Sequence, residues 1–501
     1  MSLQTRLLGA VSLLGILPLL GSLSGCAVGP DFKKPDAPSA SAYTPAPLAD
    51  PTATPGVVAG DAQRFVQAED IGGDWWTAFH SPALNALIDQ SLKNNSDLKA
   101  AEATLRQAHE NAIAQKGAFY PQVGAQFGAS HQEQPETLAP VPSNNSFQYD
   151  LFTPELTISY APDIWGLTRR TVESYNAQSD AARYQMLATY TTLVNNVIAT
   201  AVEEAATRAQ IDATNQVIAA EKKSLDILQY QKDKGYASGV DLAQQVSALA
   251  AAEATLPPLI KQDAQYHDLL AVLVGKFPAE APPESLKLSD LTLPADLPVT
   301  LPATLVSQRP DVMQAESNLH AASAQIGIAV ANRLPNLSLS GNAGSSALVL
   351  NQLFQPGTEF WTVAANLTAP LFDGGTLLHQ ERAARAAFDA SAAQYRSTLL
   401  TAFQNVADTL VALQQDAELV KAASASDTAA RTTLSLTQQQ LKDGYTNDLG
   451  LLAAEQAYQQ AEVTLLGAQS ARFADTAALF QALGGGWWHR TDLPDQDAKN
   501  G

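Results

Sequence analysis

The stretch DLKAAEATLRQAHENAIAQKGAFYPQVGAQ, residues 97–126, returns later in the chain as DVMQAESNLHAASAQIGIAVANRLPNLSLS, residues 311–340. Asp, Ala, Glu, Leu, Ala and Pro recur in the same order without a gap, and Pro121 and Pro335 lie 214 residues apart. Self-similarity at a fixed period is the sequence signature of a fold that uses one supersecondary plan more than once. The chain is therefore expected to consist of two halves of one design.

A second similarity extends the repeat beyond this stretch. KGYASGVDLAQQ, around Gly235, resembles DGYTNDLGLLAAEQ, around Gly444, at a separation of 209 residues. AEATL at Ala252 and AEVTL at Ala461 are also 209 residues apart. The internal repeat is therefore expected to cover most of the chain.

Within each half the hydrophobic period changes from that of a helix to that of a strand. Ala and Leu at helical spacing run from Asp97 to Phe119, and Pro121 ends the helix. Strands of about 10 residues with one apolar face are typical of outer-membrane barrels, and the alternative is a pair of ordinary surface hairpins on a helical protein. The alternating segments predict strands at 121–132, 148–162, 335–346 and 358–370.

Long helical segments follow each pair of strands. From Leu167 to Lys234 there is no proline, and the sequence is rich in Ala and Gln. A helix of this length would reach roughly 100 Å at 1.5 Å per residue. Each long helix breaks at a Gly-Tyr pair, so we expect two antiparallel coiled-coil hairpins, at about 164–275 and 373–483, with tips far from the membrane.

The only cysteine, Cys26, stands directly behind an apolar leader. Residues 1–25 carry a single charge, Arg6, followed by an apolar run with the length of a secretory signal. The run ends in Leu-Ser-Gly-Cys, which resembles the lipobox of bacterial lipoproteins; a lone cysteine is otherwise most often a buried thiol. The resemblance implies that Cys26 carries S-diacylglycerol and N-acyl chains such as palmitate, and that Ala27 directs the protein to the outer membrane.

These observations divide the chain into six segments. The proline-rich segment between the halves cannot be a long helix, and we interpret it as an irregular strap, with a flexible linker as the alternative. The predicted segments are a signal peptide 1–25, a lipidated tether 26–70, a first repeat 71–276, a strap 277–302, a second repeat 303–483 and a tail 484–501.

Charge and motifs exclude several function classes. The formal net charge of −20 becomes −21 when Arg6 is removed with the leader, whereas nucleic-acid binding needs basic patches. No apolar run after residue 26 is long enough for a transmembrane helix. The Trp75-Trp76 and Trp487-Trp488 pairs are interpreted as packing rather than ligand stacking. No metal, nucleotide or nucleophile motif is present, so we expect no cofactor other than the lipid, and no enzyme.

Four strands in one chain are too few for a membrane barrel. The smallest known barrel has eight strands, and open sheet edges do not occur in lipid. Two copies would give eight strands around a filled bore, whereas three would give twelve and leave an aqueous lumen. The predicted fold is therefore α+β, a multi-chain conduit in which a β-barrel continues into a tube of long helices.

Six motifs stand in a fixed order along the chain. They are CAVGPDFKKP from Cys26, DWWTAFHSPALNALIDQ from Asp74, DIWGLTRR from Asp163, LPATLVSQRPDVMQ from Leu301, APLFDGG from Ala369 and ALFQALGGGWW before His489. These motifs and their order resemble the lipoprotein branch of the TolC-type outer-membrane factors, the OprM- and NodT-like outlet channels of tripartite resistance–nodulation–division efflux pumps. The resemblance implies a homotrimer with a 12-stranded β-barrel and a long α-helical periplasmic barrel, served by a periplasmic adaptor protein and an inner-membrane pump.

The predicted function is a passive outlet for drugs or other small toxic compounds across the outer membrane. The alternatives are the outlet of a type I protein secretion system and, more remotely, a coiled-coil scaffold on the outer membrane that is not a channel. The adaptor is expected at the hairpin tips, where glycine permits a tight reversal. The tip residues are Gly235, Tyr236, Ala237, Ser238, Lys442, Asp443, Gly444, Tyr445 and Thr446.

A closed end of the tunnel is also expected at the tips. In related channels leucine and acidic residues just past the second glycine turn ring the aperture. By position Leu449 matches the leucine, while Ala453 stands where an aspartate is common, and Asp448 is the candidate substitute. The predicted gate is therefore Leu449 with Asp448, and the alternative is that Leu449 packs in the seam between helices.

Overall fold

A computed structural model describes residues 27–40, 42–46, 49–134, 147–283, 286–446 and 448–493. The predicted signal peptide with Cys26, residues 135–146 and the last residues of the tail lie outside the described residues. The chain divides into two compact units. The first unit is formed by described residues of 1–34, 106–181 and 315–395, and the second by those of 35–105, 182–314 and 396–501.

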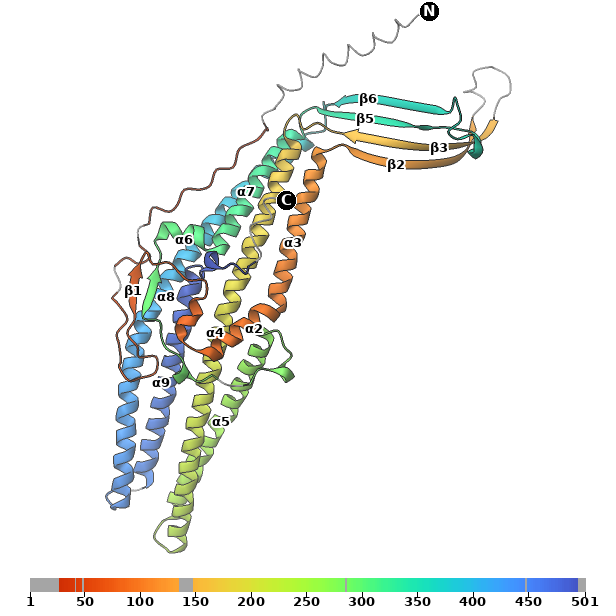
Figure 1. The fold of residues 1–501 in the computed structure, drawn as a ribbon. Coiled ribbons are helices and arrows are strands. Elements are labelled where there is room, and N and C mark those ends of the chain that lie inside the picture. Colours follow the sequence, from red (N-terminus) through yellow and green to blue (C-terminus); the bar gives the residue numbers. More distant parts are fainter. Residues whose placement is uncertain are drawn as a thin grey trace, which may run out of the picture. The chain divides into compact units, whose positions relative to one another are not determined.

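The first unit contains a four-stranded antiparallel sheet in the order β2-β3-β5-β6 (Figure 1). β2 and β3 pair along their whole length, and β5 and β6 do the same, so each pair is a hairpin. The two hairpins join through Glu155–Tyr160 of β3, which pair with Leu339–Gly344 of β5. The strands are β2 (Gln122–Gln134), β3 (Phe147–Tyr160), β5 (Asn336–Ser345) and β6 (Glu359–Thr368).

An aspartate caps the helix that follows each strand pair. Asp163 accepts hydrogen bonds from the amides of Thr168 and Arg169 at the start of α4 (Leu167–Asp233). Asp373 accepts from the amides of Gly375 and Leu377 at the start of α8 (Thr376–Lys442), and these bonds lower the pKa of Asp373. A carboxylate at this position satisfies free amides and suits the helix dipole.

The helices before the strands also have matched positions. α3 (Ser96–Lys116) leads to β2, and α7 (Pro310–Ala331) leads to β5. The Asn95 side chain accepts hydrogen bonds from the amides of Asp97 and Leu98 at the start of α3. Asp97 lies in the first turn of α3, as its sequence position predicted.

Two long helical hairpins form most of the second unit. α4 and α8 have 67 residues each, and the helices that return from them, α5 (Gly239–Leu273) and α9 (Asp448–Ala482), have 35 each. Alanine lets two helices approach closely, and the seams contain small clusters of alanine with branched residues. One seam contains Val217, Ile218 and Ala252, and the other contains Val420, Ala423 and Ala468.

The segments expected as a tether and a strap pair with each other in the second unit. Strand β1 (Arg64–Gln67) pairs in parallel with β4 (Asp296–Val299). The fully buried Arg472 of α9 donates hydrogen bonds to the carbonyl oxygens of Ala59 (2.7 Å) and Asp61 (2.9 Å). Residues 59–67 are therefore fixed to the helices rather than extended and free.

Short helices and stacked aromatic rings complete the second unit. Trp75 stacks on Phe480 at 4.7 Å between ring centroids, and the indole of Trp487 donates to the carbonyl oxygen of Gln308. These contacts are packing, as the sequence predicted for the tryptophan pairs. The remaining helices of the described chain are α2 (Pro82–Asn94), α6 (Pro302–Gln308), and the 3-10 turns η1 (Trp75–Phe79), η2 (Gly117–Phe119), η4 (Pro278–Glu280), η5 (Leu288–Asp290), η6 (Leu350–Gln352) and η7 (Trp487–His489).

Candidate functional site

The sheet of the first unit has one apolar and one polar face. Residues directly opposite each other in an antiparallel pair point to the same side. Val123 is opposite Ile158, Ile158 is opposite Gly341, and Gly341 is opposite Val363, so one row crosses all four strands without a polar side chain. The adjacent row is formed by Gly124, Thr157, Asn342 and Thr362.

No described residue of the chain covers the apolar face. Val123, Ile158, Trp361 and Val363 are all exposed, Trp361 and Val363 by more than three quarters. A large exposed apolar surface marks contact with a membrane or with another protein. The polar face of the same sheet suits water. The sheet thus presents an exposed apolar face on one side and a polar face on the other.

Both long hairpins turn at a glycine in the left-handed conformation. The φ angle is +81° at Gly235 and +75° at Gly444, where a residue with a side chain is strained. The amides of Tyr236 and Tyr445 each donate at 2.8 Å to the carbonyl oxygen five residues earlier. This is the bonding of a Schellman ending, so the two tips share one backbone conformation.

The predicted adaptor-contact residues lie in these two turns, except Lys442, which is the last residue of α8. Tyr236 and Tyr445 are 85% and 84% exposed, whereas Ala237 and Thr446 are half-buried. Ser238 begins α5 with a reciprocal capping box to Asp241, whose pKa is lowered by these hydrogen bonds. The structure thus places two exposed aromatic rings on two well-fixed turns.

The predicted gate lies at the start of the last long helix. α9 begins at Asp448, so Asp448 and Leu449 are in its first turn, and their side chains lie outside the described residues. Leu451 is buried, Leu452 is half-buried and Ala453 is exposed. The assignment of Leu449 and Asp448 to the gate stays a prediction.

A buried pair of carboxyl groups joins the two hairpins. Glu221 of α4 is 1% exposed and Glu455 of α9 is 4% exposed, and their side chains are hydrogen-bonded to each other. Gln245 of α5 donates to the Glu221 carboxylate and, at 3.2 Å, to its carbonyl oxygen. Burial and the nearby Glu221 raise the pKa of Glu455 to about 7, so a protonated Glu455 donates to Glu221. The sequence shows no signal for this pair.

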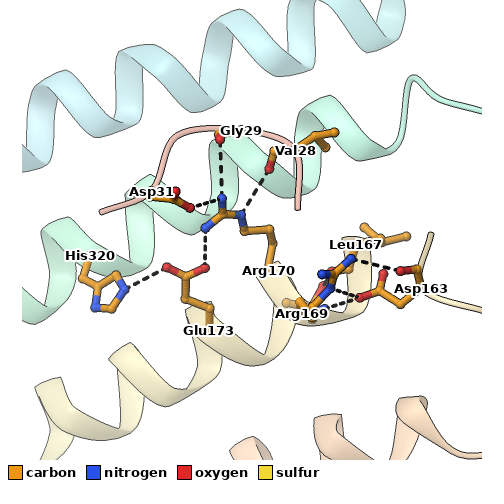
Figure 2. Close-up of polar contacts among 10 residues, drawn as sticks. Val28, Gly29, Asp31, Asp163, Leu167, Arg169, Arg170, Glu173 and His320 are labelled. Carbon is orange, nitrogen blue, oxygen red and sulfur yellow. Dashed lines mark hydrogen bonds and ion pairs between the residues drawn. The ribbon is translucent and has the colours of Figure 1, made fainter. Parts of the chain in front are cut away.

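A second polar cluster holds the amino-terminal segment in the first unit (Figure 2). The guanidinium of Arg170, on α4, donates to the carbonyl oxygens of Val28 (3.1 Å) and Gly29 (3.4 Å). It also donates to the carboxylates of Asp31 (2.7 Å) and Glu173 (2.8 Å). Burial lowers the pKa of Arg170, but the two carboxylates outweigh it and leave the pKa raised. One buried cation therefore serves four oxygen acceptors.

The described part of the chain contains neither a metal-ligand cluster nor a helical membrane span. No group of three or more His, Cys, Asp or Glu side chains there is placed to hold a metal ion. Among the same residues, no helix combines the length and the hydropathy that crossing a bilayer requires.

The profile of the outer membrane efflux protein family matches residues 87–276 and again residues 301–485. The chain belongs to this family. The family is one of transport channels, so the chain is an outer membrane efflux protein, as its sequence predicted. Each of the two matches covers one pair of strands and one long helical hairpin.

Individual relatives match over nearly their whole length. The toluene efflux pump outer membrane protein TtgC of Pseudomonas putida is 29% identical over 494 residues, which cover 97% of this chain and 98% of the relative. The pyoverdine export outer membrane protein OpmQ of Pseudomonas putida is 29% identical over 488 residues, 94% of this chain and 97% of the relative. The structure of the outer-membrane channel OprN superposes with a TM-score of 0.80 at 25% identity, and covers 92% of this chain and 100% of that one.

Proposed function

We propose that the protein is the passive outlet of a tripartite efflux system, which carries small toxic compounds from an inner-membrane pump and its periplasmic adaptor to the exterior. The observation that supports this proposal most strongly is the sheet, whose apolar face is exposed and whose other face is polar. Such a sheet suits a wall between lipid and water. The relatives export compounds as different as toluene and pyoverdine, so the substrate is set elsewhere in the system.

The sheet supports a trimer. Within the described residues β2 and β6 each pair on one side only, so each has a free edge. Free edges are costly in lipid, and pairing β2 of one copy with β6 of the next satisfies both. Three copies form a closed barrel of twelve strands, which are six hairpins, and the polar faces of the strands enclose water. The long helical hairpins of the three copies then line a tube that continues the barrel.

Lipidation of Cys26 gives a second attachment to the membrane. Ala27, the first described residue, contacts Gly166 between β3 and α4, so the described chain begins beside the end of the sheet. Mass spectrometry of the mature chain is expected to show an acylated amino-terminal Cys26. An intact Met1 or an unmodified cysteine would contradict this part of the proposal.

The tips support docking of the adaptor. The exposed Tyr236 and Tyr445 present apolar rings on fixed turns, which is the kind of surface that partners bind. We expect Ala237→Glu and Thr446→Glu to abolish efflux at unchanged trimer yield, because each places a charge in the docking surface. A matched change on the exposed flank of the hairpin, Lys223→Glu, is the control. Normal efflux in both tip variants would refute docking there.

The function itself is tested by deletion and complementation. A deletion strain is expected to become sensitive to a panel of dyes, detergents, solvents and antibiotics, and a plasmid copy is expected to restore resistance. Compounds that accumulate in the deletion strain identify the substrates. Unchanged sensitivity to the whole panel, together with a missing secreted protein, would instead support a protein secretion outlet.

A further inference from the structure

The segment Ala27–Lys34 has no helix or strand of its own, yet it is held at successive residues. The amide of Val28 donates to the carbonyl oxygen of Trp165 at 3.0 Å. The carbonyl oxygens of Val28 and Gly29 accept from Arg170 (Figure 2). Peptide groups near the interior need partners, and here a helix and a buried arginine supply them in place of a neighbouring strand.

Two glycines let the segment lie directly against α7. A Cβ atom on Gly29 would be 2.4 Å from the Cα of Gly327, and Gly29 also has a φ angle of +90°. A Cβ atom on Gly327 would in turn be 2.8 Å from the Cγ of Arg170. The backbone of the segment, the backbone of α7 and the stem of Arg170 are therefore in direct contact, with no room for a side chain between them.

The side chains of the segment are recognised as well. Asp31 pairs with Arg170, and the ring of Phe32 stacks on His320 with 4.3 Å between centroids and 13° between planes. The Nε2 atom of His320 lies 2.9 Å from Glu173, which also pairs with Arg170 (Figure 2). The carboxylate and the aromatic ring of the segment thus each bind a side chain of α4 or α7, and these side chains are hydrogen-bonded to one another.

We propose that Arg170 is the positioning residue of a clamp on α4 and α7, and that this clamp fixes the lipid-bearing amino terminus to the start of α4. The proposal rests on lipidation of Cys26, which is part of the proposed function. Cys26 precedes Ala27, and consecutive Cα atoms are about 3.8 Å apart. The clamp therefore keeps the acylated residue within one Cα–Cα distance of a residue that is fixed to the fold.

The clamp changes what the lipid restrains. A released segment would become a loose tether that reaches roughly 3.4 Å for each freed residue. The acyl chains would then tie the protein to the membrane through a long flexible connection. A docked segment instead pins the junction of β3 and α4 to the leaflet in which the acyl chains lie, so the lipid sets the depth of the sheet.

Trypsin tests the clamp in the full-length lipidated protein purified in detergent. Lys33 is exposed and is the cleavable position of the segment, because Lys34 precedes Pro35. Cleavage requires local opening, so its rate follows the population of the released segment. We expect Arg170→Ala to raise the cleavage rate at Lys33 roughly a hundredfold, because four acceptors lose their buried cation.

Two further variants separate positioning from general stability. Gly29→Ala changes the segment instead of the clamp and is expected to accelerate cleavage at Lys33 in the same way. Arg170→Lys is expected to be cleaved at Lys33 as fast as Arg170→Ala, because an ammonium cannot span the acceptors of a guanidinium. Arg169→Ala is the matched control, since the neighbouring Arg169 pairs with Asp163 and not with the segment. Hydrogen exchange of the strands is expected to stay unchanged in all of them.

Each outcome decides the proposal. Equal cleavage rates at Lys33 in the parent, Arg170→Ala and Gly29→Ala would overturn it. If Arg170→Ala loosens the whole protein, Gly29→Ala decides. Faster cleavage at Lys33 in Gly29→Ala, with unchanged exchange of the strands, supports the clamp. Continued resistance of Gly29→Ala to trypsin at Lys33 refutes it. The mass of the released fragment reports the lipid separately. A fragment without acyl chains would overturn the lipid-positioning role and lipidation together. An acylated fragment that is released slowly from the parent and quickly from the variants would support both.

Discussion

Replacing Glu455 with glutamine removes the titrating proton between Glu455 and Glu221 and should reduce the pH dependence of stability where the two hairpins meet. In the parent, burial and the neighbouring Glu221 raise the pKa of Glu455 from an ordinary 4.5 to about 7. A group whose pKa is raised by folding contributes stability that is fully present below pH 4.5 and is lost as the pH rises through about 7. The difference corresponds to about 3 kcal/mol at 1.36 kcal/mol per tenfold change. The burial of Glu221 acts in the same direction.

Hydrogen exchange of α9 amides, corrected for the intrinsic effect of pH on exchange, measures the free energy of local opening. In the parent this free energy is expected to fall by about 2.5 kcal/mol between pH 5 and pH 9, with most of the fall below pH 7. In Glu455→Gln the fall should be smaller, because only Glu221 still titrates and the glutamine amide donates to it at every pH. At pH 9 the variant should therefore exchange more slowly than the parent.

A surface carboxylate gives the matched control. Glu253 forms an exposed ion pair with Lys222, so Glu253→Gln should follow the parent profile. The reasoning is refuted if Glu455→Gln loses protection with rising pH as the parent does. It is equally refuted if the parent itself is flat between pH 5 and pH 9.

Three further changes test other contacts. Arg472→Met should lower stability by about 3 kcal/mol, because it removes a buried cation from its acceptors, and an unchanged thermal midpoint of the helical circular dichroism would contradict this. Gly484→Ala should lower the thermal midpoint more than Gly56→Ala does. Both glycines have positive φ, but only at Gly484 would a Cβ atom lie 2.6 Å from the Gln308 carbonyl oxygen. Equal losses of stability would refute the clash. Leu449→Ser should raise bilayer conductance at unchanged trimer stability, and a stability loss without a conductance change would identify a seam residue.

The regular elements could be predicted from the sequence because their signals are local. The strand expected at 121–132 is β2 at Gln122–Gln134, and the strand expected at 358–370 is β6 at Glu359–Thr368. Alternation of apolar and polar residues and the helix-ending prolines are properties of neighbouring residues. The Gly-Tyr pairs marked the hairpin turns for the same reason, since a left-handed residue favours glycine.

The contacts that define the sites could not be predicted, because they join residues far apart in the chain. β1 and β4 are four residues long, and β4 contains Pro298, so neither has a strand signal of its own. Arg170 lies 139 residues from Asp31, within a motif that was recognised only as a family feature. Glu221 and Glu455 stand in long helices that also carry many exposed charged residues, and the sequence does not distinguish them from these. Only the packed structure shows which polar side chain is buried.

The equal lengths of the long helices limit how this chain can change during evolution. Because α4 matches α8 and α5 matches α9 residue for residue in length, a deletion in one hairpin would leave its tip out of step with the other. Viable insertions and deletions in the helices must then arise in pairs, one in each half, or be lost. The strand pairs already differ in length, 13 and 14 residues against 10 and 10. Length variation among descendants of this sequence should therefore accumulate in the loops between strands, and the matched helices should keep equal numbers of residues.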